Sequence, residues 1–448
     1  MGKPQVFDDQ EQERVYERVA AVDVAKASGV VCLRLPHPAQ PAGRRSQVWE
    51  VPATMGAVGE LAGRLAGEGV QKVTLESTSD YWRVWFYVLE EAGLDVQLVN
   101  ASQARNLPGR PKTDKLDAMW LARLTELGLL RPSFVPPAEI RALRGYARAR
   151  TRLTQDRTRC WARMEKLLED ALIKVSAVAS TLTTVSVQDM IRAMIAGERD
   201  PQVLAGLARG RMRSRRGALA EALAGMFTDH HAELAQLLLD QIAFIGTQIT
   251  RLNLLISEQL AATRAAWGID ADGATGPGAG AGPGAIALPA VARLDEATGI
   301  SAELAASILS ETGLDMTQFP TPGQIVSWTG LAGRTIQSGP RTRNGKGHGN
   351  AYLRGYLCQA AIGAARTNTF LGERYRRIAR RRGAAIAQVA VARSILVIVW
   401  HLLNDPTARY HDLGPGHYQN KTDKSRKARS HIRQLEALGY TVTITQAA

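Results

Sequence analysis

The sequence predicts a mixed α/β domain followed by two largely helical regions. Between residue 18 and about residue 100, short apolar runs alternate with turns, first consecutively and then with helical stretches between them. From about residue 137 to 263, apolar residues recur with helical spacing. A segment rich in Gly, Ala and Pro then precedes a third region, also mostly helical. Strands that first follow one another and then alternate with helices indicate a mixed sheet with helices packed against it.

The N-terminal elements are predicted in a definite order. Strands are expected at 19–25, 29–35, 47–51, 70–75 and 95–100, and helices at 58–68 and 81–92. An RNase H-like, or RuvC-like, fold has this order of elements. Another small α/β sheet stays open as an alternative, because the sequence does not show the order of the strands in space.

A seam of apolar residues marks the second helical region. Leu238, Ile242, Ile245, Ile249, Leu252 and Ile256 are spaced alternately by four and three residues. That spacing is typical of a coiled coil, although so short a seam also suits a hairpin within one chain. We expect the seam to pair with another chain.

We expect six segments along the chain. They are a disordered N-terminus (1–17), a RuvC-like metal-binding domain (18–136), a helical or coiled-coil region (137–265), a Gly/Ala/Pro linker (266–286), a C-terminal domain (287–405) and a basic tail (406–448).

The composition points to a polyanionic partner. The 448 residues include 56 Lys and Arg against 42 Asp and Glu, which gives a net charge of +14. This excess favours nucleic acid as the partner. The three cysteines form no CxxC pair, which argues against a zinc ribbon and for a reducing compartment. The longest apolar run, Ile395–Trp400, is too short to cross a bilayer, so we expect a cytoplasmic protein without a membrane partner.

Four acidic residues form the first candidate site. Asp23 interrupts an apolar strand, and Glu76 ends another. Asp114 and Asp117, three residues apart, share one face of a predicted helix. Singly, each acid is more often a helix cap or a surface charge. Together they favour a site for Mg²⁺ or Mn²⁺, because hard cations prefer oxygen ligands and a carboxylate inside an apolar strand needs a partner.

Arginines form the second candidate site. Eight of them lie between Ile140 and Ala171, more than solubility requires, which favours phosphate contacts over a merely solvated face. The candidates from this helix are Arg141, Arg144, Arg148, Arg152 and Arg159. Six more arginines fall between Arg374 and Arg382 and form another candidate phosphate patch.

A basic, Gly-rich stretch around Ser338 forms the third. Arg334, Arg341, Arg343 and Lys346 are placed to hold phosphates there. Alone, Ser338 is more often a loop hydroxyl than a nucleophile. A serine nucleophile needs a base or a metal to activate it, and His348 is the one such residue nearby in sequence.

In combination, these motifs resemble the DEDD transposases of the insertion-sequence 110 family, to which the Piv-type DNA invertases are related. The resemblance covers roughly residues 18–130 and 290–365. It includes the four acids, Ser338, and the segments Asp315–Pro320, Ser327–Leu331 and Gly349–Arg354. The chain departs from the family pattern after Glu76, where a Gly usually precedes the aromatic pair, and in its Gly-rich linker.

The resemblance implies a site-specific recombinase with a composite active site. The four acids would hold Mg²⁺, Ser338 would attack a DNA phosphate, and Arg354 would contact nucleic acid. The implied partners are double-stranded DNA, as element ends and target, and a structured bridge RNA. The implied assembly is a homo-oligomer, from dimer to tetramer.

Two other classes of function stay open from the residues. One is a hydrolytic RuvC-like nuclease or Holliday-junction resolvase, in which water attacks and Ser338 is structural. The other is a nucleic-acid-binding protein without catalysis, whose acids are caps and surface charge.

Overall fold

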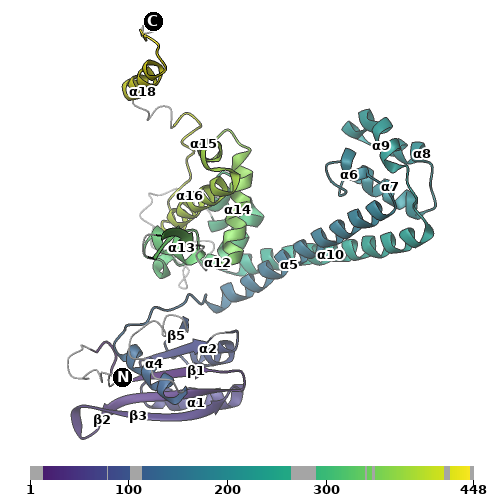
Figure 1. The fold of residues 1–448 in the computed structure, drawn as a ribbon. Helices are drawn as coiled ribbons and strands as arrows, with labels where there is room; N and C mark the ends of the chain where they lie inside the picture. Colours follow the sequence, from purple (N-terminus) through teal and green to yellow (C-terminus); the bar gives the residue numbers. More distant parts are fainter. Residues whose placement is uncertain are drawn as a thin grey trace, which may run out of the picture. The chain divides into compact units, whose positions relative to one another are not determined.

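The computed structural model describes residues 14–77, 79–100, 114–263, 289–338, 341–345, 349–417 and 424–443 (Figure 1). The chain divides into two compact units, residues 1–135 and 136–448. Each unit has its own apolar core: a sheet covered by helices in the first, and helices packed on one another in the second.

A five-stranded sheet in the order β3-β2-β1-β4-β5 forms the centre of the N-terminal unit. Its strands are β1 (Val19–Val24), β2 (Ser28–His37), β3 (Gln40–Pro52), β4 (Lys72–Ser77) and β5 (Val96–Asn100). β1 is antiparallel to β2 and parallel to β4, and β4 is parallel to β5. The predicted mixed sheet is confirmed, and it is consistent with a RuvC-like domain.

Helices cover both faces of this sheet (Figure 1). Successive strand residues point to opposite faces, and β1 supplies small apolar side chains to each. Ala20 and Val22 pack with helices α1 (Met55–Gly67) and α2 (Trp82–Glu91). Val19 and Ala21 pack with helix α4 (Asp114–Glu126) on the other face. Asp23, two residues beyond Ala21, therefore belongs to the face that α4 covers.

A buried carboxylate fixes the C-terminal end of α4. Glu126 is 2% exposed, and its Oε2 lies 2.5 Å from Nε of Arg34 on β2. Its Oε1 pairs with the guanidinium of Arg44 on β3. The Glu126 carbonyl accepts hydrogen bonds from the amides of Val15 (3.0 Å) and Tyr16 (3.2 Å). The helix cannot slide along the sheet without breaking these bonds.

A long helical hairpin begins the second unit. Its arms are α5 (Ala138–Asp170) and α10 (Asp229–Ala262), and short helices lie at its far end (Figure 1). These are α6 (Val175–Val178), α7 (Val185–Ile195), α8 (Pro201–Gly206), the 3₁₀ turn η1 (Gly210–Arg215) and α9 (Arg216–Leu223). They share one apolar core with the adjoining ends of the arms.

The apolar seam of α10 packs inside the chain. Ile245 and Ile256 are 7% and 4% exposed, and α10 lies along α5. Asn253 of α10 also accepts a hydrogen bond from Arg150 of α5 at 3.1 Å. The expectation that this seam pairs with another chain is therefore corrected: α5 of the same chain occupies it. A four-three spacing fits either partner, so the sequence alone did not decide between them.

The C-terminal part packs helices around one apolar helix. In chain order it contains α11 (Ala290–Asp295), α12 (Ala302–Thr312), the 3₁₀ turn η3 (Met316–Gln318), α13 (Pro322–Thr329), β6 (Arg334–Ser338), β7 (Arg341–Gly345), α14 (Ala351–Ala365), α15 (Phe370–Arg382), α16 (Ala384–Asn404) and α18 (Lys424–Ala437). The strands β6 and β7 form a separate two-stranded sheet.

The apolar helix is α16, which packs against α13, α14 and α15. It has 21 residues with a mean hydropathy of 1.9 in its most apolar window, half of which is buried inside the protein. The apolar run Ile395–Trp400 lies within this helix, which extends beyond the run at both ends. By length and composition the whole of α16 could cross a membrane, and within the described residues no other helix could. Its buried side chains, among them Val391 and Leu396, form part of the core.

The packing of α10 predicts unequal effects at two neighbouring positions. Ile245→Asn should lower the free energy of unfolding by about 2–4 kcal/mol, because it removes apolar contacts and buries an amide. Phe244→Asn, at a side chain that is 65% exposed, should change it by less than about 1 kcal/mol. Urea denaturation followed by circular dichroism measures both. Equal losses at the two positions would show that the seam is not the buried face.

Candidate active site and nucleic-acid surfaces

Two carboxylates stand side by side on the sheet. Asp23 of β1 and Glu76 of β4 are direct partners in the parallel register. Partners in register point to the same face, so both belong to the face covered by α4. Glu76 is 5% exposed, and Asp23 is half-buried. Two acids so close, with so little water around them, need cations or hydrogen bonds to stay charged.

The direction of α4 brings Asp117 towards this pair. At one end of the helix Glu126 bonds Arg34, which is the register partner of Val19 at the start of β1. Asp23 lies four residues further along the strand, roughly 13 Å at ~3.3 Å per residue. Asp117 lies nine residues back along the helix, also roughly 13 Å at ~1.5 Å per residue.

A second contact supports this direction. Thr125 Oγ1 lies 2.7 Å from Thr74 Oγ1, and Thr74 is the register partner of Ala21. Going back along α4 therefore means going forward along β1. The half-buried Asp117 borders the buried stripe that Leu121 and Leu124 form on α4. The helix thus carries Asp117 to the carboxylate end of the sheet.

The donor set suits a hard divalent cation. Carboxylate oxygens are the ligands that Mg²⁺ and Mn²⁺ favour. Asp114 is the first residue of α4, but its side chain lies outside the described residues. The described side chains, which include those of Asp23, Glu76 and Asp117, contain no group of three or more Asp, Glu, His or Cys residues that could hold a metal ion. A cavity of about 330 Å³ opens beyond the ends of β4 and β5, lined by Asp80 and Asn100 among others, and leaves room for a ligand there.

Ser338 is the last residue of β6 and stands opposite Arg341 of β7. The basic, Gly-rich stretch therefore contains a two-stranded hairpin. The side chains of Ser338, Arg334, Arg341 and Arg343, and all of Lys346, lie outside the described residues.

The chain that returns from this hairpin is firmly attached. A Cβ on Gly349 would lie 2.4 Å from the amide nitrogen of Gly330 and 2.5 Å from the carbonyl carbon of Thr329, so only glycine fits there. The next amide, of Asn350, donates to the carbonyl of Trp328 at 3.3 Å. The chain at Gly349 and Asn350, which precedes α14, is thus held against the end of α13.

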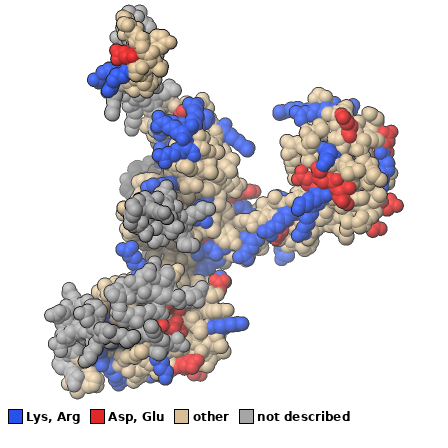
Figure 2. Space-filling view, in the orientation of Figure 1, with Lys and Arg blue, Asp and Glu red and all other residues tan. Residues whose placement is uncertain are grey.

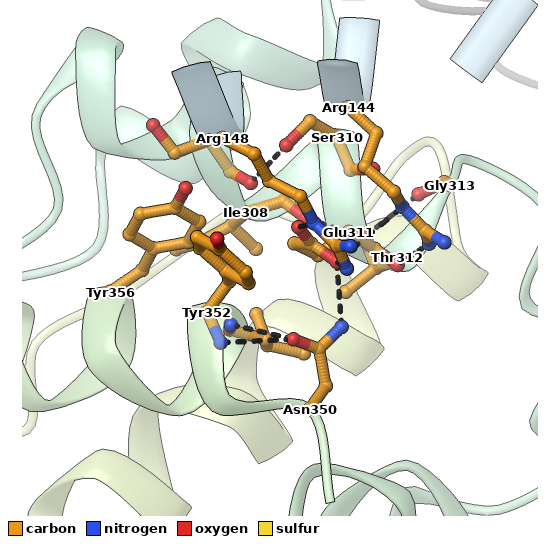
Figure 3. A network of polar contacts seen from close by, with 12 residues as sticks. Arg144, Arg148, Ile308, Ser310, Glu311, Thr312, Gly313, Asn350, Tyr352 and Tyr356 are labelled. Atoms are coloured by element: carbon orange, nitrogen blue, oxygen red, sulfur yellow. Dashed lines mark hydrogen bonds and ion pairs between the residues drawn. The ribbon is translucent and has the colours of Figure 1, made fainter. Parts of the chain in front are cut away.

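Asn350 also leads into a buried ion cluster (Figure 3). Its Oδ1 accepts hydrogen bonds from the backbone amides of Tyr352 and Leu353, with N–O distances of 3.1 Å in both cases, and so caps α14. Its Nδ2 donates to Oε2 of Glu311 at 2.6 Å. Glu311, on α12, is completely buried. The acid therefore contacts the residue that caps α14.

Two arginines of α5 neutralise Glu311. Arg148 donates from Nε (2.7 Å) and from an Nη (2.8 Å) to the two carboxylate oxygens. Arg144 donates to the backbone carbonyls of Ser310 (3.0 Å) and Glu311 (2.7 Å). Burial by itself lowers the pKa of Arg148, but the hydrogen bond and charge of Glu311 outweigh it, so that pKa is raised. The cluster joins α5, α12 and α14.

This cluster corrects the assignment of Arg144 and Arg148 to phosphate contacts, because both guanidinium groups are engaged inside the protein. Of the other predicted residues on α5, Arg141 donates to a backbone carbonyl and Arg152 donates to the hydroxyl of Tyr352. Arg159 pairs with Asp156 at the surface. Exposed pairs of this kind are weak and open readily for a phosphate.

Basic side chains gather along α5 and over α15, among other places on the surface (Figure 2). The last turn of α15 holds Arg380, Arg381 and Arg382. Arg354 of α14, the remaining predicted contact, is half-buried. These surfaces supply the positive charge that a nucleic-acid partner needs.

Two of the three cysteines are poorly suited to be a competing nucleophile. Burial raises the pKa of the Cys32 thiol to about 11 and outweighs the nearby Arg34. Burial also raises the pKa of the Cys358 thiol, against the opposing charge of Arg354. A thiol reacts as its thiolate, so neither is suited to attack a phosphate at neutral pH.

Sequence reasoning missed Glu311 and Asn350. The sequence did contain an indication for Glu311, because this acid comes two residues after the mostly apolar stretch Leu304–Leu309. A carboxylate there needs a partner for the same reason as Asp23 does. The signal for Asn350 was its position just before a helix, where an Asn side chain caps amides.

Comparison with protein families gives two matches. Residues 20–173 match the model of the IS110 DEDD transposases, described as "Transposase". Residues 291–376 match the model described as "Transposase IS116/IS110/IS902 family". A search of curated proteins gave no match. The first region contains all four acids, and the second contains both strands of the serine hairpin. The two regions lie in their expected order and together cover just over half of the chain, which therefore belongs to the IS110 family of transposases.

Proposed function

We propose that this protein is the site-specific recombinase of an insertion sequence, which cuts and exchanges DNA strands through a serine nucleophile. The observation that carries the proposal is the pairing of Asp23 with Glu76 in register, on the face that α4 covers. A family match alone would not require two acids to meet. Their adjacency on neighbouring strands, with Glu76 only 5% exposed, supports a role in chemistry.

Asp23, Glu76, Asp114 and Asp117 would hold Mg²⁺ or Mn²⁺. Bound there, the cation would supply positive charge to a phosphate and lower the proton affinity of an attacking hydroxyl. The protein's own contribution is rigidity. Strand pairing fixes Asp23 against Glu76, and the ion pairs of Glu126 fix α4 along the sheet.

Ser338 would be the nucleophile. Its Oγ would bond to the phosphorus of a DNA phosphodiester as the bond to the 3′-oxygen breaks, leaving a phosphoserine-linked 5′ end and a 3′-hydroxyl. Attack by the 3′-hydroxyl of the other duplex on that phosphoserine would release Ser338 and join the exchanged strands. The place of Ser338 at the end of a paired strand supports this role, because a nucleophile must be held still against its target.

The partners we propose are double-stranded DNA, at the element ends and at the target, and a structured guide RNA. The basic surfaces of α5 and α15 support a polyanionic partner. Strand exchange needs two duplexes and more than one nucleophile, so we propose that the protein works as a homo-oligomer, from dimer to tetramer.

A hydrolytic RuvC-like nuclease is the second candidate, because a carboxylate pair with a divalent cation also serves the attack of water. The two candidates differ in whether DNA becomes joined to the protein.

The acids should govern metal binding. Asp23→Asn and Glu76→Gln should each weaken Mn²⁺ binding at least about tenfold and abolish DNA cleavage, because each removes a charged oxygen ligand. Glu60→Gln on α1 makes the same chemical change on the opposite face of the sheet and should alter neither. Electron paramagnetic resonance titration of Mn²⁺ measures the affinity. Unchanged affinity in both acid variants would remove the proposed metal site.

Ser338→Ala should bind DNA and Mn²⁺ as the wild type does, but form no protein–DNA adduct, since it lacks the hydroxyl that attacks. End-labelled DNA incubated with each protein and separated on denaturing gels measures the adduct. Thr335→Ala, on the same strand, removes a hydroxyl three residues away and serves as the control. Cleavage by Ser338→Ala at the wild-type rate would identify water as the attacking group and favour the nuclease.

Nucleic-acid affinity should depend on the salt concentration through the exposed arginines of α5. Replacing Arg152 and Arg159 by Gln should flatten the log–log salt dependence by about 0.9 for each phosphate of duplex DNA that these side chains neutralise in the wild type. Fluorescence anisotropy at several salt concentrations measures the slope. Arg148→Gln should instead lower the melting temperature, because it removes a positive charge that balances the buried carboxylate of Glu311. A slope unchanged by the double replacement would make that face of α5 merely solvated.

A further inference from the structure

A cleft of about 910 Å³ with a mixed polar and apolar lining lies in the second unit, where the helical hairpin meets α12 and α14. Side chains from all four helices line it, among them Thr154, Arg157, Asn253, Ser301, Tyr352 and Gln359. Nothing in the reaction proposed above uses this cleft. Its walls carry hydroxyls, amides and guanidinium groups, which are the groups that bind a polar, anionic ligand.

The cleft is positively charged, and one of its cations has no partner among the described residues. Arg150 is engaged, because it donates to Asn253 (3.1 Å) and to Ser307 (2.6 Å). Arg157, which is half-buried, has no hydrogen bond or ion pair with any residue that the structure describes. Glu303 is the one acid in the described lining, and its side chain is 74% exposed. An anion entering the cleft would therefore meet more positive than negative charge.

Two tyrosines of α14 are held in place at the wall. Arg148 lies over the ring of Tyr352, 4.6 Å from its centroid, and Arg152 donates to its hydroxyl at 3.0 Å. The hydroxyl of Tyr356 bonds that of Thr151 at 2.8 Å. Tyr356 is 6% exposed and belongs to the packed wall, whereas Tyr352 is only partly buried. A partly exposed ring next to a guanidinium group is a surface on which an unpaired base can stack.

We infer that this cleft binds an unpaired polynucleotide strand. Arg157 would hold a phosphate, and the amides of Gln155, Asn253 and Gln359 would bond sugar hydroxyls or base edges. A duplex carries its phosphates on a convex surface and cannot enter a crevice between helices, whereas a flexible single strand can. The inference rests on the proposed function for the nature of the partner, and it adds a site dedicated to unpaired segments, either of RNA or of opened DNA.

Two glycines in the cleft allow a direct test. Gly246 of α10 and Gly355 of α14 both line it, and a Cβ at either position would meet nothing within 4 Å. A larger side chain at Gly355 would thus extend into the cleft without displacing the protein. Gly63, an exposed glycine within α1 whose Cβ position is equally open, provides the same substitution away from the cleft.

The experiment measures binding of three labelled probes without added metal: a ~12-nucleotide RNA, the same sequence as single-stranded DNA, and the DNA duplex. Gly355→Leu and Arg157→Gln should each weaken single-strand binding about tenfold and leave duplex binding within about twofold. Gly63→Leu and Arg192→Gln, which make the same changes of size and charge elsewhere, should leave all three affinities within about twofold. The single strand that loses more affinity identifies the source as RNA or DNA.

The inference would be overturned if both cleft variants bound the single strands as tightly as the wild type does. It would also be overturned if the variants lost as much affinity for the duplex as for the single strands. Melting temperatures establish that each variant is folded, and Arg157→Gln tests the site without filling it. Since no metal is present and no bond is cut, the result does not depend on Ser338 or the four acids. A failure of the proposed recombinase chemistry would appear in the adduct assay and not here.

Discussion

The second unit depends on one buried carboxylate. Glu311 has no access to water, and its charge is tolerated because two arginines from α5 and the amide of Asn350 surround it. Loss of one partner from such a cluster typically costs about 3–5 kcal/mol, since the remaining charge is left buried. The three helices that meet here are the arm of the hairpin, the helix of Glu311, and the helix that follows the serine hairpin. The ion pair and hydrogen bonds of Glu311 therefore fix how α5, α12 and α14 lie against one another.

The sheet and its acids could largely be predicted from the sequence. Apolar runs gave the strands to within a few residues, although β3 begins at Gln40 and not at Gln47, because it forms a long hairpin with β2 beyond the irregularity at Pro36. The charge of Asp23 inside such a run indicated a special site. What no local pattern contains is the parallel pairing that puts Asp23 beside Glu76, because pairing between β1 and β4 is decided by the whole sheet.

The sequence shows how many arginines α5 carries, but it does not show which groups they contact. Arg148 finds its carboxylate 163 residues further along the chain, and a run of positive charge looks the same whether it meets a phosphate or a distant Glu. The seam of α10 is a similar case, since its spacing specifies a helical partner and not which chain supplies it. In both cases the missing information was tertiary. Burial of a lone acid, as at Glu311, is the one local signal that would have pointed to the true partner.

The helical hairpin also sets a length. An α-helix of 33 residues, as in α5, is about 50 Å long. Double-stranded DNA rises about 3.4 Å per base pair, so this arm spans roughly 15 base pairs, or about one and a half turns. Because Glu311 holds α5 near its beginning, the small helical cluster at the far end lies at a fixed distance from the Glu311 cluster. Removing one turn from both arms would bring the two clusters closer together by about 5.4 Å.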